Sequence, residues 1–301
     1  MTALPFTATP VRAVVPVDFG DASAGAVRTA AALLRPLAGA RLHLLHVHAD
    51  ASDAAEVAVK ERLVRLAADA GLSQSRAPTV KLAQRCAADP VEAVVDYADA
   101  IGADLIVTGR REVRGWRRLA PTRTADAIVH AAQTPVLVLP EGARRGEPYW
   151  NDGRFTVVVG VSLGAGDAAL VDAVVAFVGR YATGPVRLVL AHAVAPLLPP
   201  GGEAAAFVPI DPALRARAEA AVDALAERAR AAGLDTAVRV AEGPIASTLL
   251  ALAAEARADL VALAPTAHSR LARWAFGSIA DAVTGASTRP VLLVRAPDAE
   301  A

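Results

Sequence analysis

Runs of aliphatic residues alternate along the chain with stretches in which apolar positions recur at helical spacing. AVVPV (13–17) and LIVTG (105–109) are almost wholly apolar, which is typical of strands buried on both faces of a parallel sheet. Residues 55–70 and 213–232 follow the helical period, and Gly233 ends the second stretch. The alternation predicts doubly wound α/β domains, each with an open, mostly parallel sheet of about five strands and flanking helices.

The apolar segments occur twice, in the same order. GADLIVTGR (102–110) returns as RADLVALAP (257–265), which aligns Asp104 with Asp259 at an offset of 155 residues. The other strand-like segments of the first half also have counterparts in the second half. Internal repetition of this kind indicates two copies of one structural unit.

The segment between the two copies reads as a linker. PEGARRGEPYWNDGR (140–154) combines proline, glycine and mixed charge. We therefore expect a first domain at residues 1–143, a linker at 144–153 and a second domain at 154–301. The second copy also carries a Pro/Gly-rich insertion, 194–212, which is expected to be a surface loop.

Composition restricts the functional classes. A chain of 301 residues suits two domains of about 150 residues. Its 31 basic and 31 acidic residues cancel, so no global field recruits nucleic acid or an anionic membrane. A single cysteine, Cys86, excludes an intramolecular disulfide and a multi-thiolate metal site. No run reaches the roughly 18 apolar residues of a membrane span, so we expect a soluble, cytoplasmic protein without a membrane partner.

In doubly wound sheets, ligands bind beyond the carboxyl ends of the strands, near the switch in strand order. The loops that follow Val17 and Val107 in the first copy are therefore candidate sites. Their counterparts follow Val161 and Leu263 in the second copy.

The residues at these loops resemble those of a known family. DLIVTGRREVRGWRRL and DLVALAPTAHSRLARWAFGSIADAV, followed by PVLVL and PVLLV, are similar to segments of the universal stress proteins. The resemblance covers nearly the whole chain as two tandem domains. It implies Rossmann-like, adenine nucleotide alpha hydrolase-like domains and a role in the stress response.

The resemblance also implies a nucleotide site. In the ATP-binding members, a loop Gly-x2-Gly-x9-Gly-Ser/Thr after the fourth strand wraps the phosphates and ribose, and an Asp after the first strand contacts the adenine. Small residues let backbone N–H groups approach phosphate, and a helix N-terminus adds a favourable dipole.

The first copy keeps little of that loop. Gly109 takes the first glycine position, whereas Glu112, Thr122 and Arg123 stand at the other three positions. Asp18 occupies the adenine position. This copy has kept the base-contacting acid and lost most of the phosphate cradle.

The second copy departs in the opposite way. Ala264 and Ala267 replace the first two glycines, whereas Gly277 and Ser278 match the last two positions. Ser162 stands where the adenine-contacting Asp belongs. Because alanine tolerates positive φ poorly, the cradle is half built. We expect any residual binding of ATP with Mg to occur in this copy.

The segment GRREVRGWRRLAPTR (109–123) concentrates arginines around Trp116. It would suit an anion or nucleic-acid patch. A solvated helix face with the tryptophan turned inward is the favoured interpretation, because charge runs usually lie on the surface. We expect no nucleic-acid partner.

HLLHVH (43–48) places His46 and His48 on one face of a strand and His43 on the other. Two imidazoles could bind zinc only with further ligands. The repeat pairs His46 with His192, which favours a structural role, and we predict no metal site. Cys86 is expected to be a buried small hydrophobe.

The last strand of each copy, TPVLVLP (134–140) and RPVLLVR (289–295), resembles the dimerisation strand of the family. We expect these two strands to pack the copies into an intramolecular pseudo-dimer. Two chains are further expected to form a homodimer.

The function expected from these observations is that of a non-catalytic stress-response sensor or regulator with degenerate adenine-nucleotide sites. The alternative is a nucleotide-free scaffold that binds an unknown protein partner. A slow ATP hydrolase ranks last, because the sequence has no P-loop lysine motif and no evident catalytic base.

Overall fold

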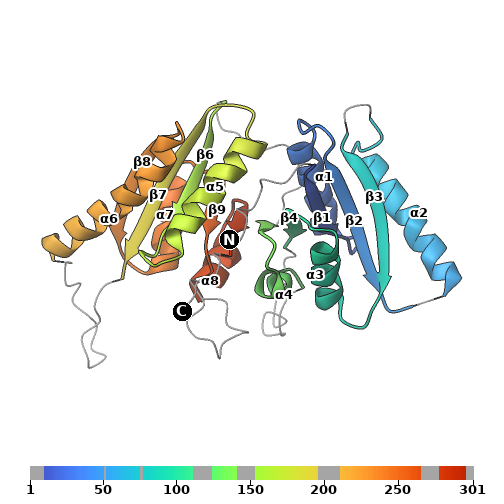
Figure 1. Ribbon diagram of the computed structural model, residues 1–301. Helices are drawn as coiled ribbons and strands as arrows, with labels where there is room; N and C mark the ends of the chain where they lie inside the picture. Colours follow the sequence, from blue (N-terminus) through green and yellow to red (C-terminus); the bar gives the residue numbers. More distant parts are fainter. Residues whose placement is uncertain are drawn as a thin grey trace, which may run out of the picture.

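The computed structural model describes residues 10–50, 52–74, 77–110, 124–140, 153–195, 211–265 and 278–295. Strands and helices alternate through both halves (Figure 1). The first half contains β1 (Arg12–Pro16), α1 (Asp21–Leu34), β2 (Arg41–His48), α2 (Asp53–Asp69), β3 (Thr79–Cys86), α3 (Pro90–Ala100), β4 (Leu105–Gly109), α4 (Thr124–Ala131) and β5 (Val136–Leu139). The second half contains β6 (Phe155–Gly160), α5 (Asp167–Tyr181), β7 (Val186–Val194), α6 (Pro212–Ala231), β8 (Asp235–Glu242), α7 (Ile245–Glu255), β9 (Leu260–Leu263), α8 (Ser278–Ala286) and β10 (Val291–Leu293).

One sheet of ten strands runs through the molecule in the order β3-β2-β1-β4-β5-β10-β9-β6-β7-β8. Within each half the five strands are parallel, as the sequence predicts. The halves meet where β5 and β10 pair antiparallel, with Leu137 opposite Leu292 and Val138 opposite Val291. The expected intramolecular pairing of the two final strands is therefore confirmed.

Helices cover both faces of the sheet and give each face its own apolar core. One core joins the sheet to α1, α2, α5 and α6, and the other joins it to α3, α4, α7 and α8. At the seam, which is the antiparallel pair of β5 and β10, Leu137 and Leu292 face the first core, whereas Val138 and Val291 face the second. Each core is consequently continuous from one half to the other.

The aspartates that the repeat aligns have the same structural task. The Asp104 carboxylate accepts a hydrogen bond of 2.8 Å from the Arg12 backbone N–H, and Asp259 accepts one of 2.8 Å from that of Thr156. Each carboxylate thus ties the start of the fourth strand of its half to the start of the first. Desolvation by burial raises the pKa of Asp104, and the hydrogen bond from Arg12 opposes this shift.

Local signals explain the ends of the helices. The side chain of Asp89 accepts hydrogen bonds from the N–H groups of Val91 and Glu92, and Pro90 follows it in the first turn of α3. Gly233 has φ of +80° just beyond α6, which confirms the predicted helix end. Among the helices in the described ranges, none has the length and apolar character needed to cross a membrane.

The helices α4 and α8 lie together at the centre of the molecule (Figure 1), and contacts to them also join the halves. Arg110 donates to the Thr284 carbonyl of α8, and Arg295 donates to the His130 carbonyl of α4. Both arginines meet the C-terminal part of a helix, where the dipole favours a cation. His130 Nε2 lies 3.4 Å from Asp281 Oδ1 across the same boundary.

The seam can be tested by removing apolar volume from it. Leu292 is fully buried, so Leu292→Ala should lower the free energy of unfolding by about 2–5 kcal/mol in urea denaturation. Val57 is 59% exposed, and Val57→Ala should change this free energy by less than about 0.5 kcal/mol. Equal effects of the two substitutions would mean that the seam does not contribute to the core.

Candidate functional site

The first half brings its predicted residues to one edge of the sheet. β1 pairs directly with β4, with Ala13 opposite Leu105 and Val14 opposite Ile106. The carboxyl ends of two adjacent parallel strands lie side by side, so Asp18 and Gly109 lie at neighbouring strand ends. This is the edge at which the sequence predicts a site.

The loop after β1 is held in a strained conformation. Phe19 has φ of +61°, which is uncommon for a bulky residue, and Asp18 Oδ1 accepts a hydrogen bond of 2.8 Å from the Gly20 N–H. The Phe19 ring lies 4.6 Å from the ring of His46 and 3.9 Å below the guanidinium carbon of Arg62. The Asp18 side chain is exposed, so this half presents a carboxylate at the strand end.

Gly109 is required for packing. A methyl group on this residue would lie 2.7 Å from the carbonyl carbon of Ala22 and closer still to its oxygen. The end of β4 therefore touches the backbone of α1, where no side chain can move aside. This contact accounts for Gly109 without reference to a phosphate.

The second half has the same arrangement of strands, with β6 paired to β9 and Gly160 opposite Leu263. Ser162 and Ala264 therefore lie at adjacent strand ends, and α8 begins at Ser278. Ala264 is half-buried and packs against the core. Ala267 and Gly277 lie outside the described residues, so their role in a phosphate-binding loop stays a prediction.

Asp167, which the sequence analysis did not select, holds the loop after β6. Its carboxylate accepts hydrogen bonds from the Ser162 N–H (3.2 Å), the Ser162 hydroxyl (3.3 Å) and the Gly164 N–H (3.0 Å). Asp167 is 2% exposed and is the first residue of α5, where the helix dipole favours a negative charge. Leu163 has φ of +64°, so this loop repeats the strained turn of the first half.

The two halves have exchanged the positions of an aspartate and a serine. Asp18 aligns with Ser162, and Ser23 aligns with Asp167, both at a separation of 144 residues. In the first half the carboxylate is exposed at the strand end, and the Ser23 hydroxyl donates to the Gly20 carbonyl (3.0 Å). In the second half the carboxylate is buried and bonded to its own loop. Alignment of the repeats could have drawn attention to Asp167, but not to its partners.

The histidines have structural partners. Nδ1 of His46 lies 2.6 Å from the Val17 carbonyl oxygen, and that of His192 lies 2.8 Å from the Val161 carbonyl oxygen. The equivalent contacts confirm the structural role inferred for this repeated histidine. His43 contacts the Tyr97 hydroxyl (2.8 Å), and burial, with nearby cations, lowers its pKa. Across the described ranges, no group of three or more His, Cys, Asp or Glu side chains is arranged to hold a metal ion.

Two further predictions concern single residues. Cys86 is exposed, so the expectation of a buried cysteine was wrong. It ends β3, which is an edge strand and is covered less than the inner strands. Of the arginines in 109–123, only Arg110 lies in the described part of the chain. Its guanidinium donates to the Thr284 carbonyl of the other half, and its Nε lies 3.6 Å from the Asp126 carboxylate.

Fold and site geometry together define a tandem α/β protein in which each doubly wound half has a potential ligand edge. The universal stress protein family model matches residues 11–140 and 154–295. The chain therefore belongs to the universal stress protein family, as two tandem copies. Comparison with curated protein sequences gives no match.

Solved structures share the architecture over the whole length. A universal stress protein from Archaeoglobus fulgidus DSM 4304 is 15% identical and aligns over 99% of this chain and 100% of its own, with a TM-score of 0.68. A functionally unknown protein from Pseudomonas aeruginosa PAO1 is 15% identical, covers 95% of this chain and 93% of its own, and has a TM-score of 0.64. A universal stress protein in complex with cAMP aligns with 48% of this chain and 98% of its own, at 26% identity and a TM-score of 0.36. The two long alignments support the fold.

The role of Asp167 can be tested by removing its carboxylate. Asp167→Ala leaves the N–H groups of Ser162 and Gly164 without their acceptor, so it should lower the free energy of unfolding by about 1–3 kcal/mol. The aligned substitution Ser23→Ala removes one hydroxyl donor and should cost less. A change below about 0.5 kcal/mol for Asp167→Ala would contradict this assignment.

The packing role of Gly109 predicts opposite effects for two glycines. Gly109→Ala should destabilise the protein by about 1–3 kcal/mol, because the new methyl group meets backbone atoms. Gly179 lies in the last turn of α5 with open space around it, so Gly179→Ala should stabilise the protein by up to about 0.5–1 kcal/mol. Thermal and urea denaturation of both variants would measure the difference. Unchanged stability of Gly109→Ala would leave the glycine unexplained by packing.

Proposed function

We propose that this tandem universal stress protein is a non-catalytic regulator whose second half binds an adenine nucleotide weakly. The proposal is supported by the geometry of the second half, in which the ends of β6 and β9 are adjacent and α8 begins nearby in the chain. A helix N-terminus presents unpaired N–H groups and a positive dipole end, which favour phosphate. α8 has nine residues and begins at Ser278, the residue that matches the family's Ser/Thr position.

Binding is proposed to be weak because the part of this site that would meet the adenine base is altered. Ser162 replaces the acid that would meet the adenine, and its N–H and hydroxyl already bond to Asp167. Ala264 places a methyl group where the family loop has glycine. A ligand would therefore rely mainly on contacts to its phosphates and on Mg²⁺.

The protein is proposed to act through its bound state without turning over a substrate. Binding of a nucleotide to the native state stabilises it by RT ln(1 + [L]/Kd), which could change its partner or lifetime. Because β5 and β10 are already paired with each other, a homodimer of two chains would have to use another surface. Slow ATP hydrolysis ranks behind this function, since the sequence shows no evident base.

The second candidate function is a nucleotide-free scaffold for a protein partner. A specific observation favours it: Gly109 is accounted for by packing, and Asp167 already occupies donors of the second loop. If both remnants of the site serve only the fold, the surface of the protein carries its function.

Nucleotide content distinguishes the two functions. The purified protein should release sub-stoichiometric or stoichiometric adenine nucleotide on denaturation, and the stripped protein should bind Mg-ATP in calorimetry. Ser278→Ala should weaken that binding by about 10–100-fold, because one hydrogen bond to a charged phosphate is worth about 1.5–3 kcal/mol.

The matched control is Ser247→Ala, which removes an exposed serine hydroxyl from the first turn of α7, where it donates to the Pro244 carbonyl (3.0 Å). This variant should bind Mg-ATP as the parent does. A protein that carries no nucleotide and gives no heat with Mg-ATP would exclude the regulator and favour the scaffold.

A further inference from the structure

A cavity of about 260 Å³ lies in the second half, between α7 and the outer strands β7 and β8. Arg187, the second residue of β7, and Arg257, which follows α7, place it toward the amino ends of the strands. The proposed nucleotide site lies at the opposite, carboxyl edge of the sheet. The cavity is therefore a separate feature.

Three arginines line this cavity. Arg187 and Arg239 belong to β7 and β8, and Arg257 lies beyond the last turn of α7. Glu255 also lines it, and Arg187 Nε lies 3.8 Å from the Asp235 carboxylate. With Asp235 counted, three positive charges still exceed two negative ones, so the balance at the cavity favours an anion.

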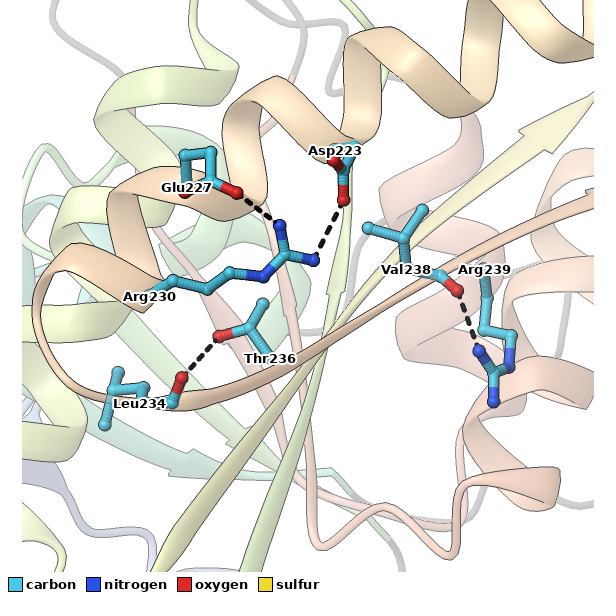
Figure 2. Close-up of polar contacts among 7 residues, drawn as sticks. All are labelled: Asp223, Glu227, Arg230, Leu234, Thr236, Val238 and Arg239. Carbon is cyan, nitrogen blue, oxygen red and sulfur yellow. Dashed lines mark hydrogen bonds and ion pairs between the residues drawn. The ribbon is translucent and has the colours of Figure 1, made fainter.

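Arg239 is exposed, and its hydrogen-bond partner differs in charge from those of Arg230. Figure 2 shows Arg230 of α6 held by two carboxylates, Asp223 at 2.9 Å and Glu227 at 2.6 Å. In the same view Arg239 donates to the carbonyl oxygen of Val238 (2.8 Å), which is a neutral acceptor. That bond leaves the charge of Arg239 unneutralised by its partner.

The first half fills the corresponding space. α3 and α7 are equivalent: the Ile101 N–H bonds to the Tyr97 carbonyl (3.2 Å), as the Ala256 N–H bonds to that of Leu252 (3.0 Å). Tyr97 thus corresponds to Leu252, which lines the cavity. In the first half Tyr97 meets His43 (2.8 Å), whereas the second half has the smaller Val189 on β7. At these two positions the second half therefore has smaller side chains than the first half.

The backbone at Arg257 is also unusual for a residue that lines the cavity. Arg257 has φ of +51°, and its counterpart Gly102 has φ of +59°. Glycine adopts this conformation without a steric cost, whereas a long side chain there is uncommon and strained. Strain of this kind clusters at functional sites. The second half bears it at a position that lines the cavity with a guanidinium.

We propose that this cavity binds a small phosphate-bearing anion. Guanidinium groups match the geometry of phosphate through paired N–H donors, and several of them can meet one phosphate. Glu255 accepts a hydrogen bond from a hydroxyl group of the same ligand. The volume lies below the roughly 300–1,000 Å³ of sites for larger ligands, so the occupant is smaller than a nucleotide.

Calorimetric titration of the full-length protein with inorganic phosphate and with glycerol 3-phosphate, at constant ionic strength, tests this proposal. Both should give saturable binding, tighter for glycerol 3-phosphate. Arg257→Gly should weaken it by about 10–100-fold, the loss expected for a charged hydrogen bond. Because the first half has glycine at this position, the variant should fold with an unchanged or raised Tm.

A second variant removes the space and keeps the charge. Leu252→Tyr introduces the side chain that fills the first half, and it should abolish binding of both probes. Arg217→Ala, which removes an exposed arginine from α6, should leave binding within about twofold of the parent and controls for net charge.

Three results would overturn the proposal: no saturable binding of either probe, binding that survives both Arg257→Gly and Leu252→Tyr, or binding that is lost in Ser278→Ala alone. The last result would assign the phosphate to the proposed nucleotide site. Conversely, failure of Mg-ATP to bind would leave this test unaffected, since the two sites have no residue in common.

Discussion

The antiparallel pairing of β5 with β10 is the interaction on which the rest of the molecule depends. These strands have only four and three residues, yet they join two five-stranded sheets into one. Their register places residues of the same core opposite one another, so each apolar core extends through both halves. So short a ladder supplies few backbone hydrogen bonds. The halves are therefore held mainly by apolar side chains at the seam and by the arginines that reach across it, Arg110 and Arg295.

The duplication separates what the fold needs from what a ligand would need. Asp104 and Asp259 retain the same bond to the first strand of their halves, and Phe19 and Leu163 retain the same positive φ. These features fix strand order and loop shape. The side chains that would face a ligand have changed instead, most clearly in the exchange that moves a carboxylate from the strand end to the interior at Asp167.

Periodicity and internal repetition were sufficient to predict the fold, because burial on both faces of a parallel strand leaves an unbroken apolar run and the two halves supply the same pattern. The pairing of the last strands was also accessible from the family resemblance. The bonds of Asp167 were not, since they depend on a loop conformation that the residue types do not encode locally. Nor was the exposure of Cys86, which follows from the edge position of β3. A glycine required by backbone packing and a glycine required by a phosphate have the same sequence signal, so the packing contact of Gly109 could not be predicted.

The two halves have diverged at opposite ends of their strands. The first half fills the space beside its outer strands with His43 and Tyr97 and leaves a carboxylate exposed at its carboxyl edge. The second half internalises that carboxylate and leaves the space beside its outer strands open and lined with arginine. Arg257 has the positive φ of a residue that ends a helix, because its N–H and that of Ala258 bond to carbonyls of the last turn of α7, as the equivalent groups do at Gly102. The second half therefore has an arginine where the first half has glycine, and this residue adds to the cavity a positive charge that the proposed anionic ligand would meet.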